Sequence, residues 1–297
     1  MIKNGNLILS QSITKDLGLL VIDDQLEEFD FCGKYVYEKH IAGTYPDVQS
    51  KAMLEGSYGE TILLGSGARG SVTSTLPTLK NGKEPVAQAR INTMMQRLYG
   101  YMYAMGVRID PLNVQVPLVA KYKNNVWLSG ELDLFPVIVN DIVSVIDIKT
   151  TKDIHNTFFT IDEEKVKSCS SGCWGSYNKI AKNQPLFYHH LVRNFKSATL
   201  EGLIRYRPDK EQTYRRLFTQ EIQSDTMFYF FIAGIGSPKI YDQLVHYGYE
   251  YTTMREKLLE TLVESAVARV SQITKEGFKP NKKDHLCNSC ALKNICC

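Results

Sequence analysis

The sequence predicts an α/β fold of the α+β type, with a central mixed β-sheet flanked by helices. Three segments with strand character lie close together in the middle of the chain, over residues 114–122, 126–135 and 142–149. Helical periodicity predicts helices on either side of them, over residues 84–105 and 177–195. Strands followed by a helix and a further strand are typical of a mixed sheet with helices packed against it.

The three central segments form a predicted meander. The polar turn Lys123-Asn124-Asn125 separates the first two, and Asn140-Asp141 leads into the third. Beyond the meander we expect a strand at residues 199–206, which residues 217–222 could pair with. Residues 24–41 show roughly helical spacing, and residues 252–275 predict a long amphipathic helix.

Length and composition fit a folded protein that can bury a sizeable core. The chain has 297 residues, of which 43% are hydrophobic and 23% charged. We expect a single domain over residues 1–297, with an N-terminal helical segment that contains Cys32 to about residue 50, a core over about 51–210, and a C-terminal helical segment with a cysteine cluster over about 211–297. The net charge of +3 neither establishes nor excludes nucleic-acid binding.

Two features of the sequence bear on its compartment. No stretch approaches the roughly 20 apolar residues that a membrane helix needs. The first residues lack the apolar core of a signal peptide. We therefore expect a cytoplasmic protein, or one of the host cytoplasm if a phage encodes it.

Charged residues interrupt the apolar pattern of two predicted strands. Asp147 and Lys149 lie two positions apart, so they share one face of their strand while Ile146 and Ile148 point into a core. Pairing with the preceding strand as a hairpin could bring Asp133 next to Asp147. Two close carboxylates repel each other unless a cation lies between them.

A hard divalent cation would suit this oxygen-rich arrangement. Mg²⁺ and Mn²⁺ prefer carboxylate and carbonyl ligands, and the backbone carbonyl of Ile148 could add an oxygen. Lys149 could orient a metal-bound water or help to deprotonate it. By itself an Asp-x-Lys pair is more often a surface salt bridge, so other residues are needed to distinguish a metal site from a salt bridge.

The predicted helix that follows contains two residues that distinguish a nuclease-type site from a surface salt bridge. Gln184 and Tyr188 lie at positions i and i+4 on one helical face, which alone could be an ordinary half-buried surface. In order, the chain reads Gly130-Glu-Leu-Asp133, Asp147-Ile-Lys149 and Gln184-Pro-Leu-Phe-Tyr188. This pattern resembles the RecB-like branch of the PD-(D/E)XK nuclease superfamily, which carries Gly-x-x-Asp, (Asp/Glu)-x-Lys and Gln-x-x-x-Tyr. The match covers roughly residues 50–206.

The resemblance implies a restriction-endonuclease-like core that hydrolyses DNA phosphodiesters with Mg²⁺ or Mn²⁺. Asp133 and Asp147 would be metal ligands, together with the carbonyl of Ile148, and Lys149 would be the catalytic lysine. Gln184 and Tyr188 would shape the site and contact DNA.

The family also carries an upstream helix with Gly-x-x-x-His, or with Glu in some branches. The best counterpart here is Gly56-Ser-Tyr-Gly-Glu60. By this resemblance Glu60 would be a third carboxylate ligand, with Glu55 as the alternative. An exposed helix carboxylate is the competing interpretation.

The cysteines suggest a second metal centre. The chain has seven, of which four lie in its last eleven residues, and an odd number argues against a closed disulfide framework. The spacing C-x₂-C-x₅-C allows three thiolates to bind one metal, and Cys32 is the candidate for a fourth ligand. The three tail residues are Cys287, Cys290 and Cys296.

This split arrangement resembles the iron–sulfur nucleases of the same superfamily, namely AddB-type nucleases and the exonucleases associated with CRISPR adaptation. It implies a 4Fe–4S cluster that joins the two ends of the chain. Zinc is the alternative, because it also takes four cysteines. Cys297 could replace Cys296, and Cys169 and Cys173 would be free thiols unless one of them replaces Cys32.

Two functions follow as hypotheses. The first is a metal-dependent exonuclease that acts on single-stranded DNA or DNA ends in recombination, repair or DNA processing, with a helicase, recombinase or integrase as a conceivable partner. The alternative is a non-catalytic module that binds DNA or a protein on the same fold. The intact Asp133, Asp147 and Lys149 favour the enzyme.

Overall fold

The computed structural model describes residues 2–3, 5–45, 51–65, 76, 86–151, 182–222, 226–234, 244–281 and 290. Within these ranges, no helix combines the length and the apolar character that crossing a bilayer requires.

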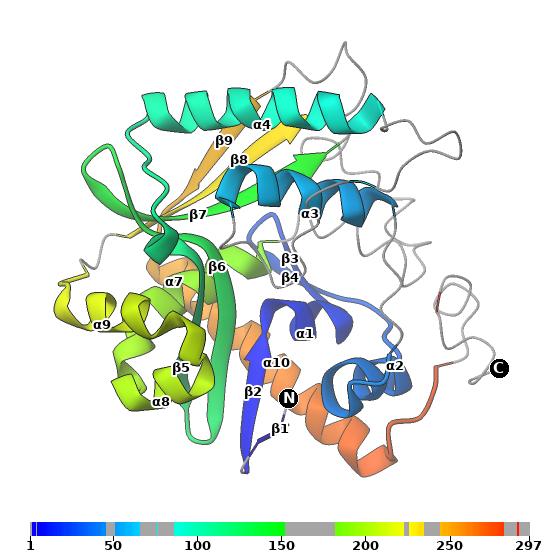
Figure 1. Cartoon of the computed structure of the whole chain (residues 1–297). Coiled ribbons are helices and arrows are strands. Elements are labelled where there is room, and N and C mark those ends of the chain that lie inside the picture. Colours follow the sequence, from blue (N-terminus) through cyan, green and yellow to red (C-terminus); the bar gives the residue numbers. More distant parts are fainter. Residues whose placement is uncertain are drawn as a thin grey trace.

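A seven-stranded mixed sheet forms the centre of the fold (Figure 1). Its strands run in the order β1-β2-β6-β7-β8-β9, and β5 pairs with β6. The pairs β5–β6 and β6–β7 are antiparallel, whereas β2–β6 and β7–β8 are parallel. The strands are β1 (Ile2–Lys3), β2 (Asn6–Ser10), β5 (Val114–Lys123), β6 (Val126–Val139), β7 (Ile142–Thr151), β8 (Met227–Gly234) and β9 (Leu244–Tyr249); β3 (Leu19–Ile22) and β4 (Gln25–Glu28) form a separate hairpin.

Helices cover both faces of this sheet, which confirms the predicted fold class. Figure 1 shows α3 and α4 on one side of β7, β8 and β9, with α7 and α10 on the other side. Each layer encloses its own apolar cluster. The helices are α1 (Gln11–Asp16), α2 (Gly33–Tyr37), the π-helix η1 (Glu38–Ala42), α3 (Lys51–Leu64), α4 (Val86–Ala104), α7 (Asn183–Asn194), α8 (Leu200–Tyr206), α9 (Glu211–Thr219) and α10 (Thr253–Glu276); the 3₁₀ turns are η3 (Pro111–Asn113), η6 (Phe195–Ser197) and η7 (Pro208–Lys210).

The long strand β6 has an unpaired stretch on one edge. β5 follows its opposite edge over most of its length. On the first edge, β2 pairs with residues 126–129 and β7 pairs with residues 134–139. In these registers residues 130–133 therefore have no strand partner on that edge. The gap lies where β2 ends and α1 begins, and it positions the site described below.

The structure confirms the three central strands, the helix at 86–104 and the long helix at 253–276. The strand expected at residues 199–206 is wrong, because the Thr199 side chain accepts from the Gly202 amide at 3.0 Å and caps helix α8. A strand over residues 217–222 is also wrong, since Leu217 belongs to the amphipathic helix α9. Residues 24–41 are helical only from Gly33, after strand β4.

Candidate active site

Asp133 reaches β7 at the point where β6 and β7 separate. The last residues of β7 that pair with β6 are at Ile146, opposite Leu134, and the register shifts nearby. Such irregularities redirect side chains. Asp133 is 2% exposed, and its Oδ2 accepts the backbone N–H of Ile148 at 2.9 Å. The carboxylate thus takes the place of the missing strand partner and lies against the motif on β7.

Strand alternation on β7 separates the core residues from the charged ones, as the sequence predicts. Ile146 and Ile148 pack into the cluster beneath α3 and α4. Asp147 is 1% exposed, and its Oδ2 forms an ion pair with Lys149 Nζ. Burial by itself would lower the pKa of Lys149, but the carboxylates of Asp147, Asp133 and Glu60 raise it above its ordinary value. We call Asp133, Asp147 and Lys149 the carboxylate centre.

Helix α7 fixes the orientation of Asp147. Gln184 Nε2 donates to Asp147 Oδ1 and also to Tyr188 Oη, the latter at 3.1 Å. Tyr188 Oη in turn donates to the backbone carbonyl of Glu131 on β6 at 2.7 Å. One helical turn therefore connects the two strands that carry the carboxylates. Both side chains are at most 4% exposed, so they shape the site; the predicted DNA contact stays a prediction.

Gly130 allows α7 to approach β6 this closely. A Cβ atom at this position would lie 2.7 Å from the ring of Tyr188 and 2.9 Å from Leu191. Any larger residue would push the helix away from the strand, and Gln184 with it. The glycine of the Gly-x-x-Asp motif thus has a packing role.

Helix α3 brings Glu60 near the centre. The helix packs on β7 through Gly56 and Gly59, whose added Cβ atoms would lie 3.4–3.5 Å from Thr150. Glu60 follows one turn after Gly56 and is close enough to raise the pKa of Lys149. The described residues nevertheless contain no group of three side chains spaced to hold a metal ion, so a third ligand at Glu60 stays a prediction. The alternative, Glu55, is buried and lies 3.7 Å from Lys51 of the same helix.

Sequence reasoning missed Lys15 on α1. Only 5% of this residue is exposed, and it interacts electrostatically with Lys149 and Asp147. Its sequence context resembles an ordinary exposed helix, Gln-Ser-Ile-Thr-Lys-Asp. No local signal marks it, because its proximity to the centre depends on the pairing of β2 with β6.

The comparison with protein families agrees with this geometry. The family model for the PD-(D/E)XK nuclease superfamily matches residues 72–297. The chain belongs to this superfamily.

A solved structure has a fold similar to that of this superfamily member. A crystal structure from Eubacterium rectale, of a protein provisionally described as an exonuclease, matches with a TM-score of 0.56 and 16% identity. The match covers 97% of this chain and 87% of the other. At this identity it supports the fold alone. No curated protein matches the sequence.

In this PD-(D/E)XK chain, Cys32 lies where the segment after α10 returns to the N-terminal region. The Asn281 backbone N–H donates to Cys32 Sγ at 3.5 Å, and its side chain donates to the Phe31 carbonyl at 3.1 Å. The Lys34 amide donates to the Lys279 carbonyl at 3.3 Å. We call this contact between Phe31–Lys34 and Lys279–Asn281 the cysteine junction.

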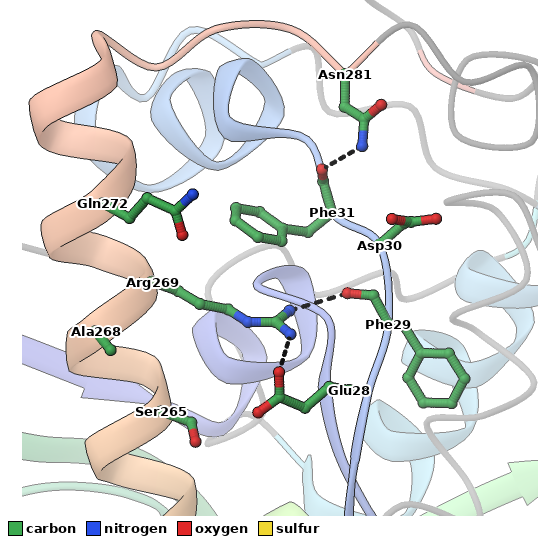
Figure 2. A pocket seen from close by; sticks show the side chains of 9 residues that line it. All are labelled: Glu28, Phe29, Asp30, Phe31, Ser265, Ala268, Arg269, Gln272 and Asn281. Atoms are coloured by element: carbon green, nitrogen blue, oxygen red, sulfur yellow. Dashed lines mark hydrogen bonds and ion pairs between the residues drawn. The ribbon is translucent and has the colours of Figure 1, made fainter.

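A cavity of about 400 Å³ lies beside the junction, between α10 and the chain that leads to Cys32. Figure 2 shows Arg269 of α10 crossing it to Glu28 and the Phe29 carbonyl, at 2.6 and 2.9 Å, with Asn281 against Phe31. Cys32 and Cys290 are free and partly exposed. The other predicted ligands, Cys287 and Cys296, lie outside the described residues, as do Cys169, Cys173 and Cys297.

Proposed function

We propose that this protein is a Mg²⁺- or Mn²⁺-dependent deoxyribonuclease of the RecB-like branch, acting as an exonuclease on single-stranded DNA or DNA ends. The observation that carries the proposal is that Asp133 accepts the Ile148 amide next to Asp147, while Lys149 interacts with both carboxylates and Gln184 donates to Asp147. A role in recombination, repair or DNA processing, alongside a helicase, recombinase or integrase, fits such an activity.

The donor set suits a hard divalent cation. Two carboxylates that are at most 2% exposed come from neighbouring strands, and one of them touches the backbone of Ile148. Burying two like charges together is unfavourable without compensating positive charge, which a divalent cation would supply directly between the carboxylates. Asp133, Asp147 and the Ile148 carbonyl would hold the ion, with Glu60 as a further carboxylate.

The residues of the chain then have separate roles. A bound divalent ion supplies positive charge for phosphoryl oxygens and lowers the pKa of a coordinated water. Lys149 would orient the attacking water and stabilise negative charge through its ammonium group. Gln184 and Tyr188 keep Asp147 aligned, so that no reorganisation is needed when the substrate binds.

Digestion of end-labelled single- and double-stranded DNA tests the proposal. We expect products with Mg²⁺ or Mn²⁺ and none with chelator, and we expect Asp147→Ala and Lys149→Ala to abolish digestion. Gly100→Ala serves as the control, because an added Cβ there would lie in open space on α4. A fully folded wild-type protein that degrades neither substrate would refute the enzyme. Shortening from one end indicates an exonuclease, and internal fragments indicate an endonuclease.

We further propose that Cys32, Cys287, Cys290 and Cys296 hold a 4Fe–4S cluster that closes the cysteine junction. The return of Lys279–Asn281 to Cys32 supports it, since a thiolate at Cys32 would accept the Asn281 N–H. The cluster would hold the two ends of the domain together and would take no part in the cleavage of DNA. Anaerobic purification followed by iron, sulfide and zinc analysis decides between the cluster and zinc, and a protein without bound metal would refute both.

A further inference from the structure

Lys15 is a buried cation for which the described residues provide no close partner. Its Nζ takes part in none of the hydrogen bonds or ion pairs found among them, although 95% of the residue is covered. Burial first, and then the charge of Lys149, lowers the pKa of Lys15 to about 7, against the opposing charges of Asp147 and Asp16. A buried ammonium group without a partner costs free energy, and an arriving anion would offset that cost.

The fold holds Lys15 beside the carboxylate centre. Strand β2 ends at Ser10, which pairs with Ser129, and α1 starts there, next to the unpaired stretch of β6 that ends at Asp133. Thr14 then fixes α1 to α7, because its Oγ1 accepts from Asn183 Nδ2 at 2.9 Å. Asn183 directly precedes Gln184, the residue that holds Asp147.

The neighbouring lysine is already engaged. Lys149 forms an ion pair with Asp147 Oδ2. Lys15 is therefore the amine near the centre that no carboxylate of the described residues holds at ion-pair distance. A lysine in this position binds phosphate as a compact point charge.

We propose that Lys15 binds a phosphate group of the nucleic-acid strand held at the carboxylate centre, an inference that rests on the proposed nuclease function. The phosphate is either a bridging phosphodiester next to the cleaved bond or a terminal phosphate of the strand. Both present the same anionic oxygens to the ammonium group.

The test uses Lys15→Met, which keeps the length of the side chain and removes its charge. Lys123→Met is the matched control, because Lys123 is exposed on the β5–β6 hairpin and pairs with Glu260. Binding of a fluorescent single-stranded oligonucleotide is measured by anisotropy in chelator, so that no strand is cut. We expect Lys15→Met to weaken binding about tenfold, the size of one charged hydrogen bond. The slope of log K against log salt should also fall by about 0.7, as for one lost phosphate contact.

Stability separates this role from a structural one. We expect the midpoint of thermal unfolding of Lys15→Met to equal or exceed that of the wild type, since an unpaired buried charge has been removed. A lower midpoint or loss of the fold would overturn the proposal and make Lys15 a structural counter-ion. Binding and salt slope equal to those of Lys123→Met would overturn it too.

Oligonucleotides with a 5′-phosphate, a 3′-phosphate or hydroxyl ends identify the phosphate. A defect confined to one phosphorylated end assigns Lys15 to a terminal phosphate, and an equal defect on all three assigns it to a bridging one. If the wild type binds through Lys15 but digests nothing with Mg²⁺ or Mn²⁺, the nuclease proposal fails and this inference stands. If it digests DNA while Lys15→Met binds normally, only this inference fails.

Discussion

The carboxylate centre and the cysteine junction are stabilised in different ways. Asp133 and Asp147 are almost completely buried, and side chains or backbone groups of β6, β7 and α7 hold both of them. Cys32 is partly exposed, and hydrogen bonds of 3.1, 3.3 and 3.5 Å join its surroundings to the returning chain.

This difference indicates which of the two sites needs a bound metal to hold its geometry. The carboxylate centre is part of the packed core, so its geometry is formed by folding and is ready before any ion binds. At the junction, hydrogen bonds from Asn281 and to Lys279 join the returning chain to Phe31–Lys34, and a metal bound by Cys32 and the tail would add a further connection. The predictions that follow test these two sites and the contacts that position them.

Gln184→Met should reduce kcat about 10- to 100-fold, because Asp147 loses the donor that orients it. Saturating Mn²⁺ during the rate measurement keeps metal affinity from masking the effect. The control is Gln88→Met, which removes another buried glutamine, one that accepts from the Leu76 amide at 3.1 Å on the α4 side of the molecule. If both variants lose the same activity, Gln184 has no special role at the centre.

Cys32→Ser should release the bound metal and lower the free energy of unfolding by about 2–4 kcal/mol, as expected when a cross-link that closes a long loop is lost. Metal analysis and urea denaturation measure the two effects. Cys169→Ser should change neither. The reverse outcome, with metal lost only from the Cys169 variant, would show that Cys169 and not Cys32 is the fourth ligand.

Gly130→Ala should lower the free energy of unfolding by about 1–3 kcal/mol, because the new methyl group would overlap the Tyr188 ring. Urea denaturation measures the loss. Gly100→Ala should instead stabilise the protein by about 0.5–1 kcal/mol, since alanine favours an open helical position. A Gly130 variant as stable as the wild type would show that α7 is not closely seated on β6.

Asp16→Asn should have the smallest effect, about 1 kcal/mol at neutral pH. Burial by itself would raise the pKa of Asp16, but the hydrogen bond to His40 and the charge of Lys39, at 2.6 and 2.8 Å, hold it below its ordinary value. A carboxylate with a lowered folded pKa contributes stability above its unfolded pKa of about 4, and loses it as the pH falls further.

Urea denaturation between neutral and acid pH checks this sign. The stability of the wild type should decline more steeply below about pH 4 than that of Asp16→Asn. Asp141→Asn, at an exposed turn before β7, should follow the wild type. Parallel declines of the wild type and the Asp16 variant would mean that this contact between α1 and η1 adds nothing.

Much of the carboxylate centre could be predicted from sequence because its residues follow local rules. Alternation on a strand places Asp147 and Lys149 on one face, and helical spacing places Gln184 and Tyr188 together. Asp133 could be placed near β7 because it lies on β6, the strand that directly precedes β7 in the chain. These relations depend on short separations, and the structure contains the Asp147–Lys149 ion pair, the Gln184–Tyr188 hydrogen bond and a hydrogen bond from β7 to Asp133.

Long-range pairing accounts for what could not be predicted. β8 pairs with β7 in parallel although about eighty residues separate them, and β2 pairs with β6 across more than one hundred. No local pattern in the sequence encodes these partners, so Lys15 could not be placed at the site. Helix α8 was missed because its leucine, isoleucine and tyrosine residues also suit a strand.

Anomalous scattering from a crystal grown with Mn²⁺ would show whether a divalent ion binds between Asp133 and Asp147. We expect a manganese peak in contact with carboxylate oxygens of both Asp133 and Asp147, and no such peak in crystals of Asp147→Asn. A wild-type crystal with DNA-degrading activity but no manganese between these two carboxylates would contradict the account.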